Sequence, residues 1–309
     1  MEPDWPLIGV RFALYAVLAG LFGLSTFSLY GLIGGERGSA LALRPWLVVS
    51  AGFALLLSLF SIVLMASAMA GTPLWPIDQA TIMALLTGSA IGAAWMVRIT
   101  ALLLALIAAV FAADRGAWLA FIALASGVAL ASLAWTGHGA MDEGATGWLH
   151  LAADILHLVA AGVWVGALLG LILLVSRPTA RVDAAHLKMT HRALHGFGTI
   201  GTIVVGTIVV TGLVNGWLIV GIGNVGWLGA TIYGRLLLAK LALFLLMLGL
   251  ASLNRYMLTP ALEASIAGAD HRGALGALRA SLAVEITCVV TILALVAWLG
   301  TLEPPRSPM

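Results

Sequence analysis

The chain has 309 residues, of which 62% are hydrophobic and only 9% are charged, and its formal net charge is +2. Soluble domains carry about 25% charged residues, so this composition excludes a soluble enzyme, a nucleic-acid-binding protein and a disordered scaffold. The single cysteine, Cys288, excludes a disulfide framework and a thiolate zinc site. We therefore expect an integral membrane protein with no nucleic acid among its partners.

Apolar segments long enough to span a bilayer define the predicted architecture. A transmembrane helix needs about 20 mostly apolar residues, and eight such segments follow one another along the chain. The sequence thus predicts an all-α, polytopic helix bundle that forms a single transmembrane domain over residues 1–309. Residues 79–87 and 221–234 fit either a helix extension or a short interfacial segment. The eight predicted spans are Pro6–Ile33, Pro45–Ala70, Ala90–Ala113, Ala117–Trp135, Leu149–Val175, Phe197–Val220, Leu236–Leu258 and Leu282–Leu302.

Lysine and arginine gather on one side of this predicted bundle. The loops on that side hold ten of them, whereas the opposite side, which includes both termini, holds only Arg306. Cytoplasmic loops of membrane proteins are enriched in these residues, so we expect both termini outside the cytoplasm. The ten residues are Arg37, Arg44, Arg115, Arg177, Arg181, Lys188, Arg192, Arg255, Arg272 and Arg279.

The second predicted span contains two methionines near its outer end. Met65 and Met69 are four residues apart, which places them on one helix face. Thioether sulfur favours Cu(I) over zinc, magnesium or calcium, but methionine is also a common packing residue. Both interpretations remain open at this point.

Charged side chains inside the predicted spans are functional candidates, because each costs about 2.5–3.5 kcal/mol on insertion scales. Glu285 lies near the inner face, and the others lie in the outer half of the bundle. They can also pair with one another, for instance Asp154 with Arg98 or Lys240, and Arg235 can extend to the interface. The outer-half residues are Arg11, Arg98, Asp154, Arg235 and Lys240.

The fifth predicted span carries His150, Asp154 and His157 at positions i, i+4 and i+7. This spacing puts all three on one helix face over about 10 Å, and His138 closes the fourth span at the same outer surface. Neutral imidazole suits copper, zinc, iron and nickel, and a carboxylate can complete the shell or orient a ligand histidine. A lone helical histidine usually satisfies a backbone group, but this set indicates a metal site. Three further histidines fall in the basic inner loop and are interpreted as marking the lipid headgroup boundary: His186, His191 and His195.

The segment GHG at 137–139, followed by ADILHLVAAGVWVGALL, closely resembles the CopD family of copper-resistance membrane proteins, called PcoD in enteric bacteria. The resemblance runs from about Trp135 to Leu302, so residues 135–302 are expected to form a CopD-like core. Its most specific motif is His-x-x-Ala-Ala-x-x-Trp-x-Gly, which begins here at His157 and includes Trp164. Other matching residues are Lys240, Asn254, Arg255 and Glu285.

Two positions depart from the family pattern. The family more often has Gly-His-Ala, where this chain has Gly137-His138-Gly139. Many members have an arginine where this chain has His195. Neither departure removes a candidate ligand.

The resemblance implies copper handling in the bacterial inner membrane, with copper, as Cu(I) or Cu(II), moving inward from the periplasm. It also implies a partner, a periplasmic copper-binding protein of the CopC type, in addition to the lipid bilayer. The candidate metal ligands are His138, His150, Asp154, His157, Met65 and Met69. Further candidate site residues are Trp164, Lys240, Asn254, Glu285 and Arg98.

Two alternatives remain at the level of sequence. A b-type membrane cytochrome could take haem ligands from His138, His150, His157 and His195, although all but His195 crowd the outer side. A copper-binding partner that does not transport would use the same residues as a permease. The chain has neither a GxxxxGK[ST] motif nor an aspartyl-phosphate loop, so we expect neither active pumping nor enzyme activity.

Overall fold

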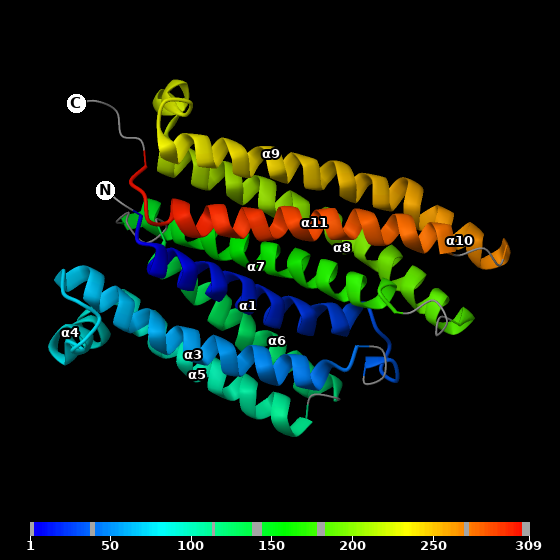
Figure 1. The fold of residues 1–309 in the computed structure, drawn as a ribbon, viewed down its shortest axis with the longest axis horizontal. Coiled ribbons are helices and arrows are strands. Elements are labelled where there is room, and N and C mark those ends of the chain that lie inside the picture. Colours follow the sequence, from blue (N-terminus) through cyan, green and yellow to red (C-terminus); the bar gives the residue numbers. More distant parts are fainter. Residues whose placement is uncertain are drawn as a thin grey trace.

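The computed structural model describes residues 3–37, 41–112, 115–137, 144–177, 183–268 and 272–304, which form helices and turns and no strand. Eight helices in these residues are long and apolar enough to cross a membrane, which confirms the predicted all-helical, multi-span fold (Figure 1). They are α1 (Trp5–Tyr30), α3 (Leu43–Ala70), α5 (Ala90–Ala112), α6 (Gly116–Ala131) extended by the 3-10 helix η1 (Ser132–Thr136), α7 (Gly144–Val175), α8 (Ala184–Val220), α9 (Ile232–Leu253) and α11 (Arg272–Leu299).

Shorter elements account for the segments whose role the sequence left open. Residues 79–87 belong to a separate helix, α4 (Gln79–Gly88), because the backbone at Ser89 is extended and interrupts the path into α5. Residues 222–227 form the 3-10 helix η4 (Ile222–Trp227) between α8 and α9. Beyond α9 the chain continues through a π-helical turn, η5 (Asn254–Leu258), into α10 (Thr259–Gly268).

Helix α8 begins well before the predicted start at Phe197. The carboxylate of Asp183 caps it by accepting a hydrogen bond from the backbone N–H of His186 at 2.7 Å, so α8 begins at Ala184. Consequently His186, His191 and His195 lie on a helix rather than in a loop. The prediction missed this part of α8 because an apolar run marks only the lipid-buried length of a helix.

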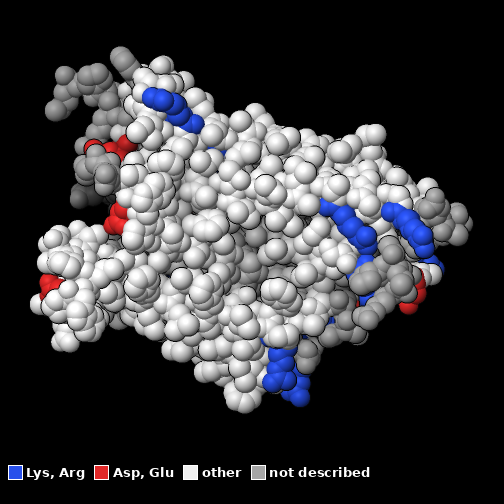
Figure 2. Space-filling view, in the orientation of Figure 1, with Lys and Arg blue, Asp and Glu red and all other residues white. Residues whose placement is uncertain are grey.

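The two ends of the bundle differ in charge. Trp5 of α1 and Trp298 of α11 pack with ring centroids 5.5 Å apart, and α4 lies at the same end of the molecule, here called the terminal end (Figure 1). The opposite end, where α1 and α7 finish, is called the basic end. On the face drawn in Figure 2, most lysine and arginine side chains lie at the basic end.

Helices α1 and α7 approach each other through glycines in the middle of the bundle. A Cβ on Gly166 would overlap the backbone of Gly23, and a Cβ on Gly170 would overlap the ring of Phe27. Small residues let transmembrane helices pack closely where no hydrophobic effect drives association. The glycines of the 157–166 motif and its continuation therefore fix α7 against α1.

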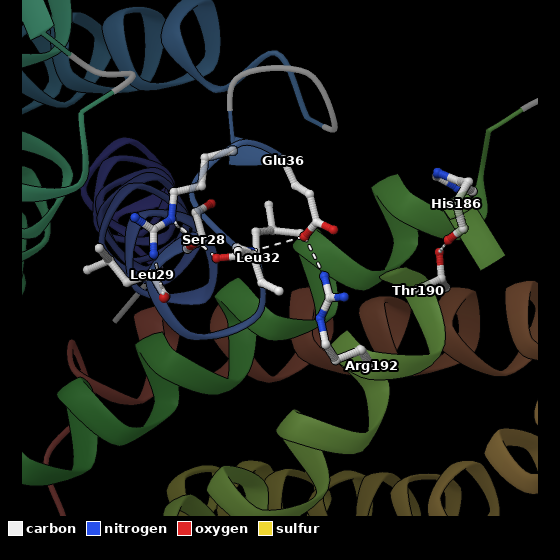
Figure 3. Close-up of polar contacts among 9 residues, drawn as sticks. Ser28, Leu29, Leu32, Glu36, His186, Thr190 and Arg192 are labelled. Carbon is white, nitrogen blue, oxygen red and sulfur yellow. Dashed lines mark hydrogen bonds and ion pairs between the residues drawn. The ribbon is translucent and has the colours of Figure 1, made fainter. Parts of the chain in front are cut away.

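Arginines cap helix ends at the basic end. Arg37 donates hydrogen bonds to the carbonyls of Ser28 and Leu29 near the end of α1, each at 3.0 Å, and Arg192 of α8 pairs with Glu36 (Figure 3). Cations stabilise the carbonyl end of a helix through its macrodipole. Arg37 therefore caps the end of α1, and Arg192 connects α8 to the turn that follows α1.

Candidate functional site

A polar stripe runs down α7 in the terminal half of the bundle. His150 is buried, with 2% of its surface exposed, while Asp154 and His157 are partly buried one and two turns further along. His150 interacts electrostatically with Asp154. The predicted arrangement of these three side chains along one helix is thus present, and the stripe meets polar groups of α8 and α9.

His157 is oriented by a threonine on α8. Its Nδ1 lies 3.0 Å from Oγ1 of Thr211, and Thr211 donates its only hydroxyl proton to the carbonyl of Thr207 at 2.6 Å. With this proton assigned to the Thr207 carbonyl, Oγ1 accepts from Nδ1 of His157, which then carries a proton. In the neutral imidazole this leaves the lone pair on Nε2 available to a metal ion, the arrangement found when an outer partner orients a ligand histidine.

Asp154 lies where four other elements meet α7. Its Oδ1 accepts a hydrogen bond from the amide of Asn215 on α8 at 3.4 Å, and its Oδ2 faces Gly137 at the end of η1. Lys240 of α9 and Arg11 of α1 are its cationic neighbours. Among the described residues, none of the lysine or arginine nitrogens comes within the 4.0 Å of an ion pair with Asp154, so the stripe keeps a carboxylate that can interact with a cation.

The described residues alone do not gather a complete ligand set. Within them, no group of three or more His, Cys, Asp and Glu side chains lies close enough together to hold a metal ion. The candidate ligand His138 lies outside the described residues, as do the neighbouring Asp142 and Glu143. Of the candidate ligands, the described residues therefore supply Asp154 and His157, and His150 lies one turn closer to the terminal end.

The two methionines occupy different surroundings. Met65 lines a small cavity between α1, α3 and α5 that also contains Arg11 and Arg98, whereas Met69 is 66% exposed at the end of α3. That cavity includes neither Met69 nor His157, so the structure does not bring the methionines together with the α7 stripe. The reason is that α3 packs on α1, α5 and α4.

Trp164 extends the stripe toward the basic end as an aromatic layer. It is 3% exposed, and its ring packs against Phe197 of α8 and Phe244 of α9 with centroids 6.4 Å and 6.3 Å apart. Its indole N–H has no hydrogen-bond partner among the described residues. Because its ring packs on Phe197 and Phe244, Trp164 belongs to an aromatic cluster on the basic-end side of the stripe.

A second polar pair lies toward the basic end. The amide of Asn254, in the π-helical turn, donates a hydrogen bond to the carboxyl of Glu285 on α11, which is 1% exposed. No described lysine, arginine or histidine pairs with Glu285. Single π-helical turns occur frequently at functional sites, and a buried carboxyl without a cation partner is expensive in a membrane.

The sequence analysis missed two residues of the site, Thr211 and Asn215. They face His157 and Asp154 across the α7–α8 interface. The available signal is their spacing, because Thr207, Thr211 and Asn215 recur every four residues in an otherwise apolar segment. Such a polar stripe in a transmembrane helix is expected to face another helix rather than lipid.

Fold and site together define a multi-pass helical membrane protein with a polar, histidine-containing site in one half of its bundle. Family comparison matches residues 1–148 to the N-terminal domain of copper resistance protein D-like proteins and residues 191–299 to copper resistance protein D. Copper resistance protein D of Pseudomonas syringae pv. tomato is 45% identical over 302 residues, which cover 96% of both chains. The chain belongs to the copper resistance protein D family.

Two further relatives match over shorter segments. The copper transport protein CutJ of Bacillus subtilis (strain 168) is 33% identical over 144 residues, or 47% of this chain and 25% of the relative. The inner membrane protein YebZ of Escherichia coli (strain K12) is 31% identical over 128 residues, or 41% of this chain and 42% of the relative. No solved structure shows a significant match.

Proposed function

We propose that the chain is a copper permease of the bacterial inner membrane, acting as a single transmembrane domain that moves copper from the periplasm to the cytoplasm. The proposal draws on the family relationship and on the printed name of the relative CutJ, a copper transport protein. It assigns no catalytic step to the chain.

The observation that carries the proposal is the orientation of His157. Thr211 holds its Nδ1–H, which leaves Nε2 as a ligand, and Asp154 one turn away adds a carboxylate. Imidazole nitrogen is a good ligand for copper. In this proposal His138 and His150 receive the ion at the terminal end, and Asp154 and His157 carry it into the bundle.

The charge asymmetry of the bundle supports the proposed orientation in the membrane. Basic side chains concentrate at one end (Figure 2), and positively charged loops face the cytoplasm. The terminal end then faces the periplasm, where a copper-binding protein of the CopC type would deliver the ion. The acidic residues described at this end, Asp4, Asp78 and Glu303, suit a cationic cargo.

The inner half of the path would use Glu285 and Asn254. A carboxyl buried at 1% exposure next to a neutral amide favours taking up either a proton or a passing cation, because an isolated buried charge is costly. Lys240, near Asp154 and His157, would balance their charge when copper is absent, and its flexible side chain can withdraw when the ion arrives.

The described histidines do not supply a haem ligand pair, while pairs with His138 lie outside the described residues. His150 and His157 lie on one helix, so they cannot bind opposite faces of one haem. His195 lies 16 residues before Thr211 on α8, which corresponds to about 24 Å along the helix. Since Thr211 marks the level of His157, the pair His157 and His195 is too far apart to ligate one iron.

Copper uptake by purified protein in proteoliposomes tests the proposal. We expect copper to accumulate inside protein-containing vesicles well above the level in protein-free vesicles, for Cu(I) under reductant or for Cu(II). Binding of copper without any uptake would instead indicate a non-transporting copper-binding partner. A Soret band with split α and β bands in the purified protein would identify a cytochrome.

A further inference from the structure

A small cavity in the terminal half of the bundle contains two arginines, and no residue of α7 lines it. It has a volume of about 30 Å³ and lies between α1, α3, α5 and η1, the first three of which run side by side in Figure 1. Its polar lining comes from Arg11, Tyr15, Ser61, Trp95, Arg98 and Thr136. A space of this size holds one or two species of the size of a water molecule.

Within the described residues, Arg98 faces this cavity with neither a hydrogen-bond partner for its Nε nor an ion pair for its guanidinium. Only 2% of it is exposed. A guanidinium carries five donors, and a buried charge without a partner costs several kcal/mol. No described carboxylate lies beside it, so an anion there would lower the cost of its burial.

The other polar groups of the cavity do not meet this requirement. Arg11 donates from Nη1 to the carbonyl of Thr136 at 3.0 Å, and its Nε has no partner in the described chain. Trp95 already donates its indole N–H to the carbonyl of Ser58 at 2.7 Å. The Tyr15 hydroxyl lies beside Arg11 and within electrostatic range of Arg98, but a phenol is neutral near pH 7.

The charge balance of this half of the bundle points the same way. Inside it, the described residues contribute three cationic side chains, Arg11, Arg98 and Lys240, and one carboxylate, Asp154. Asp154 interacts with Lys240 and Arg11, so no carboxylate among the described residues compensates Arg98. Arginine is the preferred residue for binding anions through several hydrogen bonds.

We propose that this cavity is a binding site for a small monovalent inorganic anion of the size of chloride, held between Arg98 and Arg11. The small volume excludes larger organic anions, and the rest of the lining, which includes Leu14, Ile62 and Met65, is apolar. The bound anion supplies the counter-charge that lets two arginines remain in the membrane-spanning part of the chain. This proposal does not depend on copper transport.

Thermal unfolding of the purified full-length protein in detergent tests the site. Unfolding is followed by tryptophan fluorescence in gluconate buffer at constant ionic strength, while chloride progressively replaces gluconate. A ligand that binds only the folded state raises the Tm with its concentration. We expect a saturable rise of roughly 5 °C when chloride is a hundredfold above its Kd, and a similar rise with bromide.

Two variants test whether the chloride effect on the Tm arises at Arg98. Arg98→Gln should unfold at the same temperature in chloride and gluconate, whereas Arg235→Gln, which alters an exposed arginine on α9, should keep the full rise. Equal Tm values for the unchanged protein in the two salts, or a chloride effect that persists in Arg98→Gln, would overturn the proposal. If Arg98→Gln does not fold, the proposal is tested by measuring the binding of radiolabelled chloride to the unchanged protein. Saturable binding near one ion per chain that bromide displaces supports the site, and its absence rejects it.

Discussion

Nδ1 of His157 on α7 and Oγ1 of Thr211 on α8 lie 3.0 Å apart, and this contact determines which nitrogen of the histidine can bind a metal. The threonine hydroxyl has a single proton, and the carbonyl of Thr207 accepts it at 2.6 Å. Nδ1 must then be the donor, and Nε2 carries the lone pair. Thr211 thereby orients the ligand His157 without contacting the ion itself.

Replacing Thr211 with valine tests this positioning role. Valine keeps the branched shape but removes the oxygen that accepts from Nδ1, so the imidazole loses its fixed tautomer and orientation. Loss of such an outer partner typically weakens metal binding by about 10–100-fold. We expect Thr211→Val to raise the copper concentration needed for half-maximal uptake by about tenfold. Thr207→Val, one turn away on the same helix, is the control and should leave this concentration nearly unchanged. An equal effect of both variants would contradict the positioning role.

The contact between α1 and α7 predicts a strong stability effect at Gly166. A Cβ there would overlap the backbone of Gly23, so Gly166→Leu must push the two helices apart. Overpacking costs about 1–3 kcal/mol even where side chains can adjust, and here the obstacle is backbone. We expect a clearly lower Tm in detergent. Gly206→Leu on α8, where a Cβ would meet nothing within 4 Å, should leave the Tm close to that of the unchanged protein. A normal Tm for Gly166→Leu would show that α1 and α7 are not in this contact.

Replacing Glu285 is expected to reduce copper transport without lowering the stability of the protein. Glu285→Gln keeps the shape of a buried side chain that accepts a hydrogen bond from Asn254, but it removes the charge that the membrane must tolerate. The Tm should therefore stay the same or rise, while copper uptake falls by about tenfold, which corresponds to 1.4 kcal/mol in the free energy of the step. Glu263→Gln, on the exposed side of α10, is the matched control. Undiminished uptake by Glu285→Gln would remove this carboxyl from the path.

The ion pair between Glu36 and Arg192 predicts a pH effect at the basic end. Partial burial would raise the pKa of Glu36, but hydrogen bonds from Arg192 and from the backbone of Ile33 outweigh it, and the pKa lies below the usual 4.5. A carboxyl with a lowered pKa stabilises the fold above its unfolded pKa, and this contribution is lost as the pH falls through the folded pKa. We expect Glu36→Gln to lower the free energy of unfolding by less than about 1 kcal/mol at pH 7. The difference from the unchanged protein should shrink as the pH falls below the usual glutamate value of 4.5, and a constant difference would contradict the assignment.

The spans and the polar stripe of α7 could be predicted because both depend on local regularities. Apolar length marks a transmembrane helix, and the spacing of His150, Asp154 and His157 places them on one face of any helix. The structure agrees with the predicted spans to within a few residues, except at the starts of α7, α8 and α11. There the helices extend beyond the apolar run, which hydropathy does not record.

The neighbours of these side chains could not be predicted, because they depend on which helices touch. The spacing of Met65 and Met69 correctly gives a common face of α3, but that face meets the arginine cavity and the surface instead of α7. Likewise, no local pattern shows that Asn215 reaches Asp154 or that Lys240 of α9 lies near His157. Helix order in the bundle is set by close glycine contacts such as Gly23 with Gly166.

Copper uptake by the His157→Ala variant in proteoliposomes tests the central claim most directly. The substitution removes the ligand nitrogen but leaves the apolar surface that drives membrane insertion, so the protein should reconstitute normally. His191→Ala, at the basic end of α8, serves as the control for loss of a histidine. We expect uptake by His157→Ala to fall at least tenfold while His191→Ala transports at the rate of the unchanged protein. Full uptake by His157→Ala at equal protein content would show that copper does not pass along the α7 stripe.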